Sequence, residues 1–111
     1  MSLPHNSARG EVPLSVGGVD LVIAAEMGRL AKLSTALGCQ SFGELYQKLL
    51  GVELAAVRSA IENLTVAGDV GKALNHISIR DLTACATAFA AALAFQMGDG
   101  DQGNAEAAGD V

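Results

Sequence analysis

Apolar and polar residues alternate along two short runs near the start of the chain, and a Gly-Gly pair separates the runs. The apolar positions are Val12, Leu14, Val16, Val19, Leu21 and Ile23. Alternation with a period of two is typical of β-strands. Gly17 and Gly18 suit a two-residue hairpin turn, because such turns need positive φ angles. We therefore predict an antiparallel hairpin in which Val16 faces Val19 and the six apolar side chains share one face.

Pro13 indicates which strand lies at the edge of the sheet. In the predicted register it faces Val22 at a position that does not hydrogen-bond to the partner strand. The N–H group that proline lacks would then point away from the hairpin, and proline is tolerated at such positions on edge strands. The first strand should therefore be an edge. The apolar face of the hairpin needs helices to cover it, because an isolated hairpin is marginally stable in water.

The remaining chain shows the spacing of apolar residues that is typical of helices. We predict helices over about residues 24–37, 42–50, 53–66 and 78–97, with a short helical turn over residues 70–75. Gly38 and Gly51 are stop signals, and Ser41 with Glu44 has the spacing of a capping box. The expected inward-facing residues of the first three helices are Met27, Leu30, Leu33, Leu37, Phe42, Leu45, Tyr46, Leu49, Leu54, Val57, Ile61 and Leu64. On the polar side of the third helix, Arg58 and Glu62 have the spacing of an ion pair.

The last predicted helix contains no charged residue over residues 82–95. Ser78 is its expected N-cap, and Asp81 lies near the positive end of the helix dipole. Phe89 and Leu93 line one face. A helix that is apolar on most sides is buried on most sides. This helix is therefore either the centre of the core or a surface for oligomerisation or a partner. It is too short and too rich in alanine to span a membrane.

These patterns predict one α+β domain that is mostly helical, with an N-terminal hairpin packed against about four helices. We expect residues 1–9 to be a flexible lead-in, residues 10–97 to be the domain, and residues 98–111 to be a disordered acidic tail. The net charge is −5, and most of it lies in this tail. No basic stripe occurs, which argues against direct binding of nucleic acid.

Two motifs in the tail could each be interpreted as a ligand-binding site. Residues 98–103 spell GxGxxG, but they follow a predicted helix, whereas a dinucleotide site needs a strand before the motif and a helix after it. Asp99, Asp101 and Asp110 resemble a calcium loop only faintly, because the later ligand positions do not fit. We interpret both as parts of a flexible end.

Cysteine and histidine residues are few and far apart in the sequence. Cys39 and Cys85 lack metal-site spacing, so a zinc site would require the fold to gather both of them with His5 and His76. A cysteine in an alanine-rich helix is more often a small buried side chain. We expect reduced thiols, no catalytic residue, no metal and no cofactor.

The predicted hairpin and helices, with their glycine positions taken in order, resemble those of a known protein family. The residues concerned are Gly10-Glu11-Val12, Gly17-Gly18, Leu21, Met27, Leu30, Leu33, Leu37-Gly38, Phe42-Gly43-Glu44-Leu45 and Leu49. This pattern resembles the small tail proteins of gene transfer agents and phages, of the tail-assembly chaperone type. The resemblance covers about residues 10–66 and rests on pattern and order. It implies a non-enzymatic protein that binds tape-measure or tail-tube subunits, in the cytoplasm of a bacterial host or associated with the virion.

Two surfaces could serve such binding. The hairpin edge at Val12 and Leu14 would accept an added strand, and the side of the last helix with Phe89, Leu93 and Phe95 would pack against a partner helix. The alternative is a small homo-oligomeric helical scaffold or adaptor unrelated to phages, with the last helix as its dimer seam.

Overall fold

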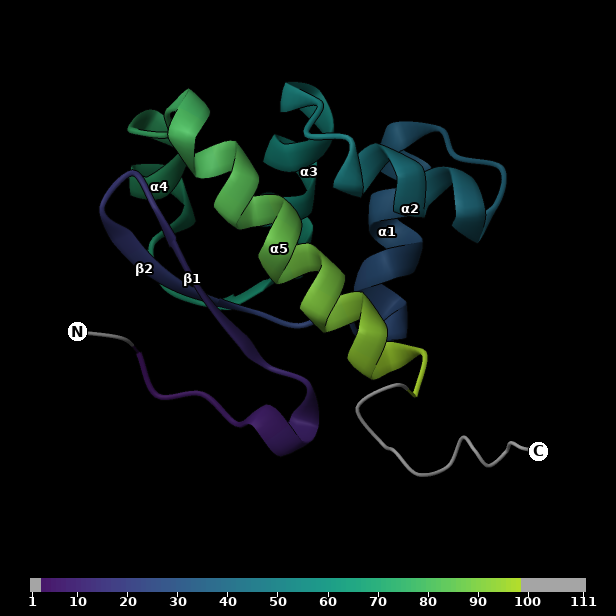
Figure 1. The fold of residues 1–111 in the computed structure, drawn as a ribbon, viewed down its shortest axis with the longest axis horizontal. Helices are drawn as coiled ribbons and strands as arrows, with labels where there is room; N and C mark the ends of the chain where they lie inside the picture. The colour runs from purple at the N-terminus through teal and green to yellow at the C-terminus, as the bar shows by residue number, and fades with distance from the viewer. Residues whose placement is uncertain (1–2, 99–111) are drawn as a thin grey trace.

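A three-stranded antiparallel sheet with helices packed against it forms the fold in a computed structural model, which describes residues 3–98 (Figure 1). In chain order the elements are the 3-10 helix η1 (Ser7–Arg9), β1 (Val12–Val16), β2 (Val19–Ile23), α1 (Met27–Leu37), α2 (Phe42–Leu50), α3 (Leu54–Leu64), β3 (Thr65–Ala67), α4 (Val70–Asn75) and α5 (Ile79–Gln96). The protein is therefore an α+β protein that is mostly helical, as the sequence predicted. The short η1 falls within the segment that we expected to be a flexible lead-in.

The hairpin has the predicted register. Val16 pairs with Val19, and Pro13 lies opposite Val22. The two turn glycines have positive φ angles, 58° at Gly17 and 79° at Gly18. The strand order β1-β2-β3 leaves β1 at an edge of the sheet, which confirms the inference drawn from Pro13.

The third strand is a feature that the sequence analysis missed. We predicted helix through residue 66, but α3 ends at Leu64 and the next three residues pair with β2. Thr65 and Val66 are β-branched and favour extended backbone. Pairing with β3 also explains why Val22, expected on the polar face of the hairpin, is only 1% exposed: it lies in the middle strand, opposite Ala67.

The helix boundaries agree closely with the prediction, apart from the end of α3 and the start of α1. Ala24 and Ala25 are buried and non-helical, and the Ala24 N–H donates to the Leu64 carbonyl at 2.9 Å. Ser41 caps α2 by accepting a hydrogen bond from the Glu44 N–H at 3.2 Å. The predicted helical turn over residues 70–75 is α4, with Ala73 and Leu74 buried. No helix within residues 3–98 has the length and apolar character needed to cross a membrane.

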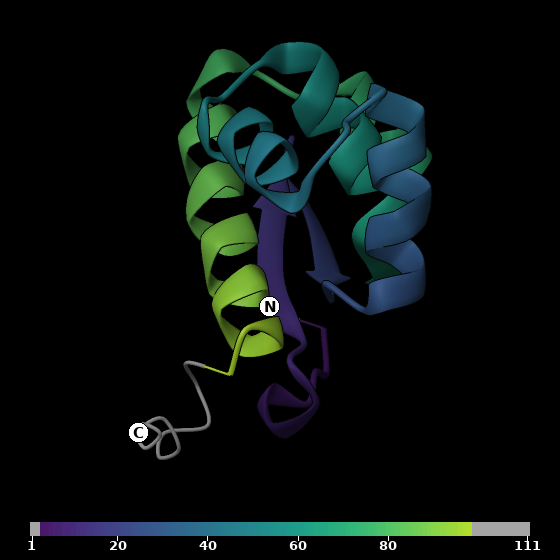
Figure 2. The same ribbon diagram turned by 90° about the vertical axis from the view of Figure 1, so that its right-hand side faces the viewer.

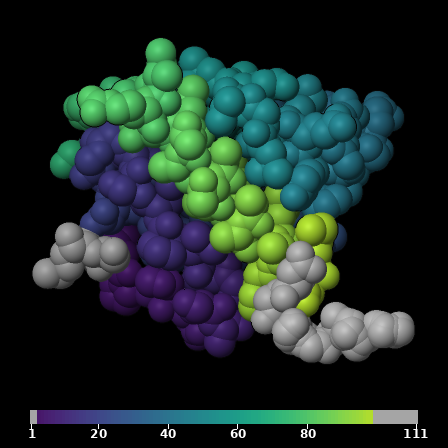
Figure 3. All heavy atoms as spheres, viewed as in Figure 1, coloured from purple at the N-terminus to yellow at the C-terminus, as the bar shows by residue number. Residues whose placement is uncertain are grey.

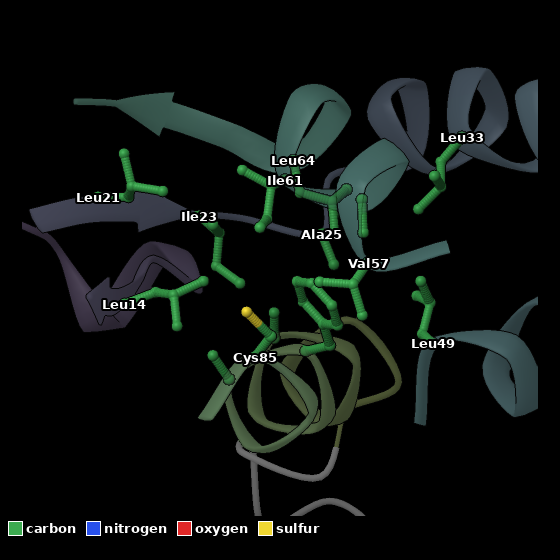
Figure 4. Close-up of a cluster of buried hydrophobic side chains, with 14 of the residues drawn as sticks. Leu14, Leu21, Ile23, Ala25, Leu33, Leu49, Val57, Ile61, Leu64 and Cys85 are labelled. Carbon is green, nitrogen blue, oxygen red and sulfur yellow. The ribbon is translucent and has the colours of Figure 1, made fainter. Parts of the chain in front are cut away.

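The core forms where α5, the apolar face of the hairpin and the other helices meet. Figure 2 shows α5 running alongside β1, with α1 on the other side of the hairpin. Side chains from these elements converge in Figure 4, where Cys85 of α5 faces Leu14 and Ile23 of the hairpin. Phe89 and Leu93 of α5 also belong to this cluster. The last helix is therefore part of the core.

Four helices begin with an exposed apolar residue. Met27 is 64% exposed, Phe42 44%, Leu54 55% and Ile79 86%. We expected the first three of these to point inward, and that prediction is wrong. The first residue of a helix lies beyond the packed turns, so helical spacing alone overestimates its burial.

Candidate protein-binding surface

The N-terminal end of α5 is attached to the hairpin turn through Asp81. Its Oδ2 atom accepts hydrogen bonds from the Ser78 N–H at 2.8 Å, the Ser78 hydroxyl at 3.2 Å and the Gly17 N–H at 3.1 Å. Burial of the carboxyl raises its pKa, but the hydrogen bonds from Ser78 and Gly17, with a smaller effect of the Arg80 charge, outweigh burial. The pKa of Asp81 is therefore below its ordinary value. This carboxylate joins two segments that are 64 residues apart.

The C-terminal end of α5 lies against Gly10, two residues before β1 begins. Gly10 has a φ angle of 83°, and the ring of Phe95 occupies the space that a side chain at Gly10 would need. Gly10 is buried although it belongs to a connecting segment. The helix is thus held at both ends by the segment that contains β1, which fixes its orientation along the edge strand.

The structure corrects the predicted interaction residues on α5. Phe89 and Leu93 are fully buried, and Leu14 of β1 is 6% exposed, so these three side chains form the core rather than a surface. Val12 is half-buried and packs against the core cluster. Phe95 is 37% exposed, and its ring contacts Gly10. The apolar face that we assigned to a partner is the face that packs inside this chain.

The opposite face of α5 is open, and beyond Arg80 in the first turn it carries no charged residue. Thr83, Ala84, Thr87 and Ala91 are exposed on it. Figure 3 shows α5 crossing one face of the molecule from green to yellow. A surface helix normally places charged side chains toward water. The sequence predicted burial of α5 on most sides, but within residues 3–98 nothing covers this outer face.

A shallow apolar hollow of about 380 Å³ joins this outer face to the edge strand. It is lined by Val12, Pro13, Leu14, Ser15, Ala84, Thr87, Ala88 and Ala91. In the observed register the backbone groups of Pro13 and Ser15 point away from β2. The hairpin edge and the last helix, which we predicted as two separate surfaces, therefore lie side by side. We call the residues of this region that are not buried the β1–α5 surface: Val12, Pro13, Ser15, Thr83, Ala84, Thr87 and Ala91.

The cysteine and histidine residues do not form a site together. Cys85 is buried in α5, where desolvation, with a smaller effect of the Asp81 charge, raises the pKa of its thiol to about 11. Cys39 is partly buried after α1. His76 Nδ1 lies 3.0 Å from the Lys72 carbonyl oxygen. In the part of the chain that the structure describes, no three His, Cys, Asp or Glu residues are grouped to hold a metal ion. The GxGxxG and calcium-loop motifs lie almost wholly in residues 99–111, outside the described range.

The sequence analysis also missed a second exposed apolar cluster, at the start of α3 and α5. It includes Leu54, which we assigned to the core, and Ile79, to which we gave no role. The available signal was their position immediately after the residues that cap the two helices. When the chain was compared with protein-family models, curated proteins and solved structures, none of the three comparisons found a match.

Proposed function

We propose that this protein is a non-enzymatic tail-assembly protein of a phage or gene transfer agent, and that it binds a tail-tube or tape-measure subunit through the β1–α5 surface. The observation that carries the proposal is the uncovered outer face of α5, which has no charged residue after Arg80 in its first turn. An exposed apolar surface of this kind is typical of a protein–protein interface. The resemblance over residues 10–66 supplies the class of partner.

The side chains on this surface favour close packing of a partner helix. Alanine and threonine are small, so another helix can approach the α5 backbone with little obstruction. With 18 residues at 1.5 Å each, α5 offers a contact about 27 Å long. The β1 edge would add hydrogen bonds from the Ser15 N–H and from the carbonyl groups of Pro13 and Ser15. Because Pro13 has no N–H, an added strand would form an incomplete ladder. Helix packing on α5 would therefore contribute most of the affinity.

Co-purification with tail-tube and tape-measure proteins encoded in the same genome tests the proposal. The wild-type protein should form a complex with at least one of them that survives gel filtration. Ala91→Lys places a long charged side chain on the outer face of α5, and it should weaken the complex by about tenfold or more, as expected for a charge buried without a partner. Ala36→Lys is the matched control, because Ala36 is exposed on α1, away from this surface.

Two results would contradict the proposal. One is that the wild-type protein binds neither tail protein. The other is that Ala91→Lys and Ala36→Lys behave alike, which would move binding to a different surface. A defined dimer that Ala91→Lys dissociates, with no affinity for tail proteins, would instead support the homo-oligomeric scaffold. Light scattering at several concentrations distinguishes this outcome.

A further inference from the structure

Helices α3 and α5 both begin along the upper edge of the view in Figure 1. Apolar side chains from the two helix starts gather around one hollow. Ile79 is the first residue of α5 and is 86% exposed, while Leu54 is the first residue of α3 and is 55% exposed. Ile77 and Leu82 lie between them, partly buried. With Arg58 and Ser78, these four residues line a hollow of about 300 Å³. We call these six residues the Leu54–Ile79 patch.

Arg58 is the charged side chain that lines this patch, and it has no partner in the described part of the chain. The ion pair with Glu62 that its spacing predicted does not form. Glu62 instead lines another hollow, together with Lys32 of α1. A second cation, Arg80, follows Ile79 directly and is exposed. Arg80 does not line the hollow and lies near Asp81, so Arg58 is the positive charge that the lining of the patch provides.

Two acidic residues lie close to the patch, Asp81 and Glu53, but within residues 3–98 neither forms an ion pair with Arg58. The Asp81 carboxylate accepts hydrogen bonds from Ser78 and Gly17. Glu53 precedes Leu54, but it does not line the hollow. Glu53 also makes no side-chain hydrogen bond to the first turn of α3, so the N–H groups of this turn have no side-chain acceptor. The positive end of the α3 dipole lies at the same place and adds to the effect of Arg58, whereas the Asp81 carboxylate offsets the positive end of α5.

We infer that the Leu54–Ile79 patch binds an acidic amphipathic helix of a partner protein. An aliphatic side chain of that helix would fill the hollow between Leu54 and Ile79, and a carboxylate one turn away would pair with Arg58. The patch shares no lining residue with the hollow of the β1–α5 surface. This inference is therefore independent of the proposed function and would hold for a partner outside tail assembly.

An NMR titration of the full-length, ¹⁵N-labelled protein tests this inference with two synthetic peptides. One is a short amphipathic peptide of leucine and glutamate, and the other has glutamine at every glutamate position. The acidic peptide should shift the amide signals of Leu54, Arg58 and Ile79. It should also bind at least about threefold more tightly than the glutamine peptide, as expected for exposed ion pairs.

Three variants separate the apolar and the charged contributions. Arg58→Gln should remove the preference for the acidic peptide. Ile79→Ser should weaken binding of both peptides by about tenfold, since it removes a side chain central to the contact. Because Ile79 is almost wholly exposed, this variant should keep the wild-type circular dichroism spectrum. Met27→Ser is the matched control, since Met27 is also an exposed apolar residue at the start of a helix, and it should bind both peptides as the wild type does.

The inference is overturned if the amide shifts cluster elsewhere or if no shifts occur. It is also overturned if the two peptides bind equally well, or if Ile79→Ser and Met27→Ser have the same effect. If unlabelled protein added without peptide shifts the same signals and the acidic peptide does not, the occupant is a second copy of this chain, and the assignment of a partner helix is wrong.

Discussion

Replacing Gly17 and Gly18 of the hairpin turn by alanine, one at a time, should separate two reasons why a turn requires glycine: a positive φ angle and a lack of space for a side chain. Both residues have positive φ angles, but their surroundings differ. A Cβ atom on Gly17 would lie 2.7 Å from the carbonyl carbon and oxygen of His76, whereas a Cβ atom on Gly18 would meet no atom within 4 Å. Backbone preference applies to both positions, and close approach of His76 applies to Gly17 alone.

The expected magnitudes follow from this difference. An alanine with positive φ costs roughly 1–2 kcal/mol, and the loss of chain freedom in the unfolded state offsets roughly 0.4–1 kcal/mol. Gly18→Ala should therefore lower the free energy of unfolding by about 1 kcal/mol or less. Gly17→Ala adds a steric clash with backbone atoms, and overpacking of this kind costs roughly 1–3 kcal/mol. Its total cost should be about 1–5 kcal/mol, which is about 1–3 kcal/mol more than that of Gly18→Ala.

Urea denaturation and thermal melting of the two variants measure this difference. A gap of about 2 kcal/mol corresponds to a difference in Tm of roughly 8 °C or more in a domain of this size. Backbone preference alone gives the opposite order, because 79° at Gly18 is farther from the ideal left-handed value of about 57° than 58° at Gly17 is. Equal costs, or a larger cost at Gly18, would refute the argument that His76 confines Gly17.

Three further predictions concern α5. The folded-state pKa of Asp81 lies below its unfolded value, so its carboxylate stabilises the protein above pH 4 or so. Asp81→Asn should therefore cost about 1–2 kcal/mol at pH 7 in urea denaturation, and this cost should disappear as the pH falls through the folded-state pKa. Because the Cys85 thiol is buried, with a pKa of about 11, a thiol reagent at pH 8 should modify Cys39 alone until denaturant is added. Truncation after Leu74 should unfold the protein, as seen by circular dichroism, and a folded truncated protein would show that α5 is dispensable for the core. In the full chain, Leu93→Ala should lower the free energy of unfolding by about 2–5 kcal/mol, because Leu93 is fully buried.

The hairpin could be predicted from the sequence residue by residue, because its determinants are local. The Gly17-Gly18 turn and the alternating pattern together allow a single register, and Pro13 identifies the edge. Helix ends were predictable where a capping residue or glycine is present, as at Ser41 and Gly38. These features depend on neighbours within a few residues.

The features that the sequence did not reveal depend on distant residues. Residues 65–67 form β3 because β2 is available to pair with them. Considered without β2, they continue the helical pattern of the preceding residues. The outward face of α5 was hard to distinguish from its inward face, because alanine occurs on both and the exposed side carries no charged residue after Arg80. For the same reason we assigned the candidate surface to Phe89 and Leu93. These are large apolar residues of the inward face, and both are buried in the core.

The attachment of α5 to β1 has a consequence for the way this chain is synthesised. The strand that leaves the ribosome early is covered by the helix that leaves it last, and the hydrogen bond from Gly17 to Asp81 spans 64 residues. Contacts of such long sequence separation form slowly, since a large loop must close first. During translation the apolar face of the hairpin stays exposed until α5 has emerged from the ribosome. Folding of the domain should therefore be completed only after translation of α5, and a ribosome stalled before residue 78 should carry a nascent chain that proteases cut readily.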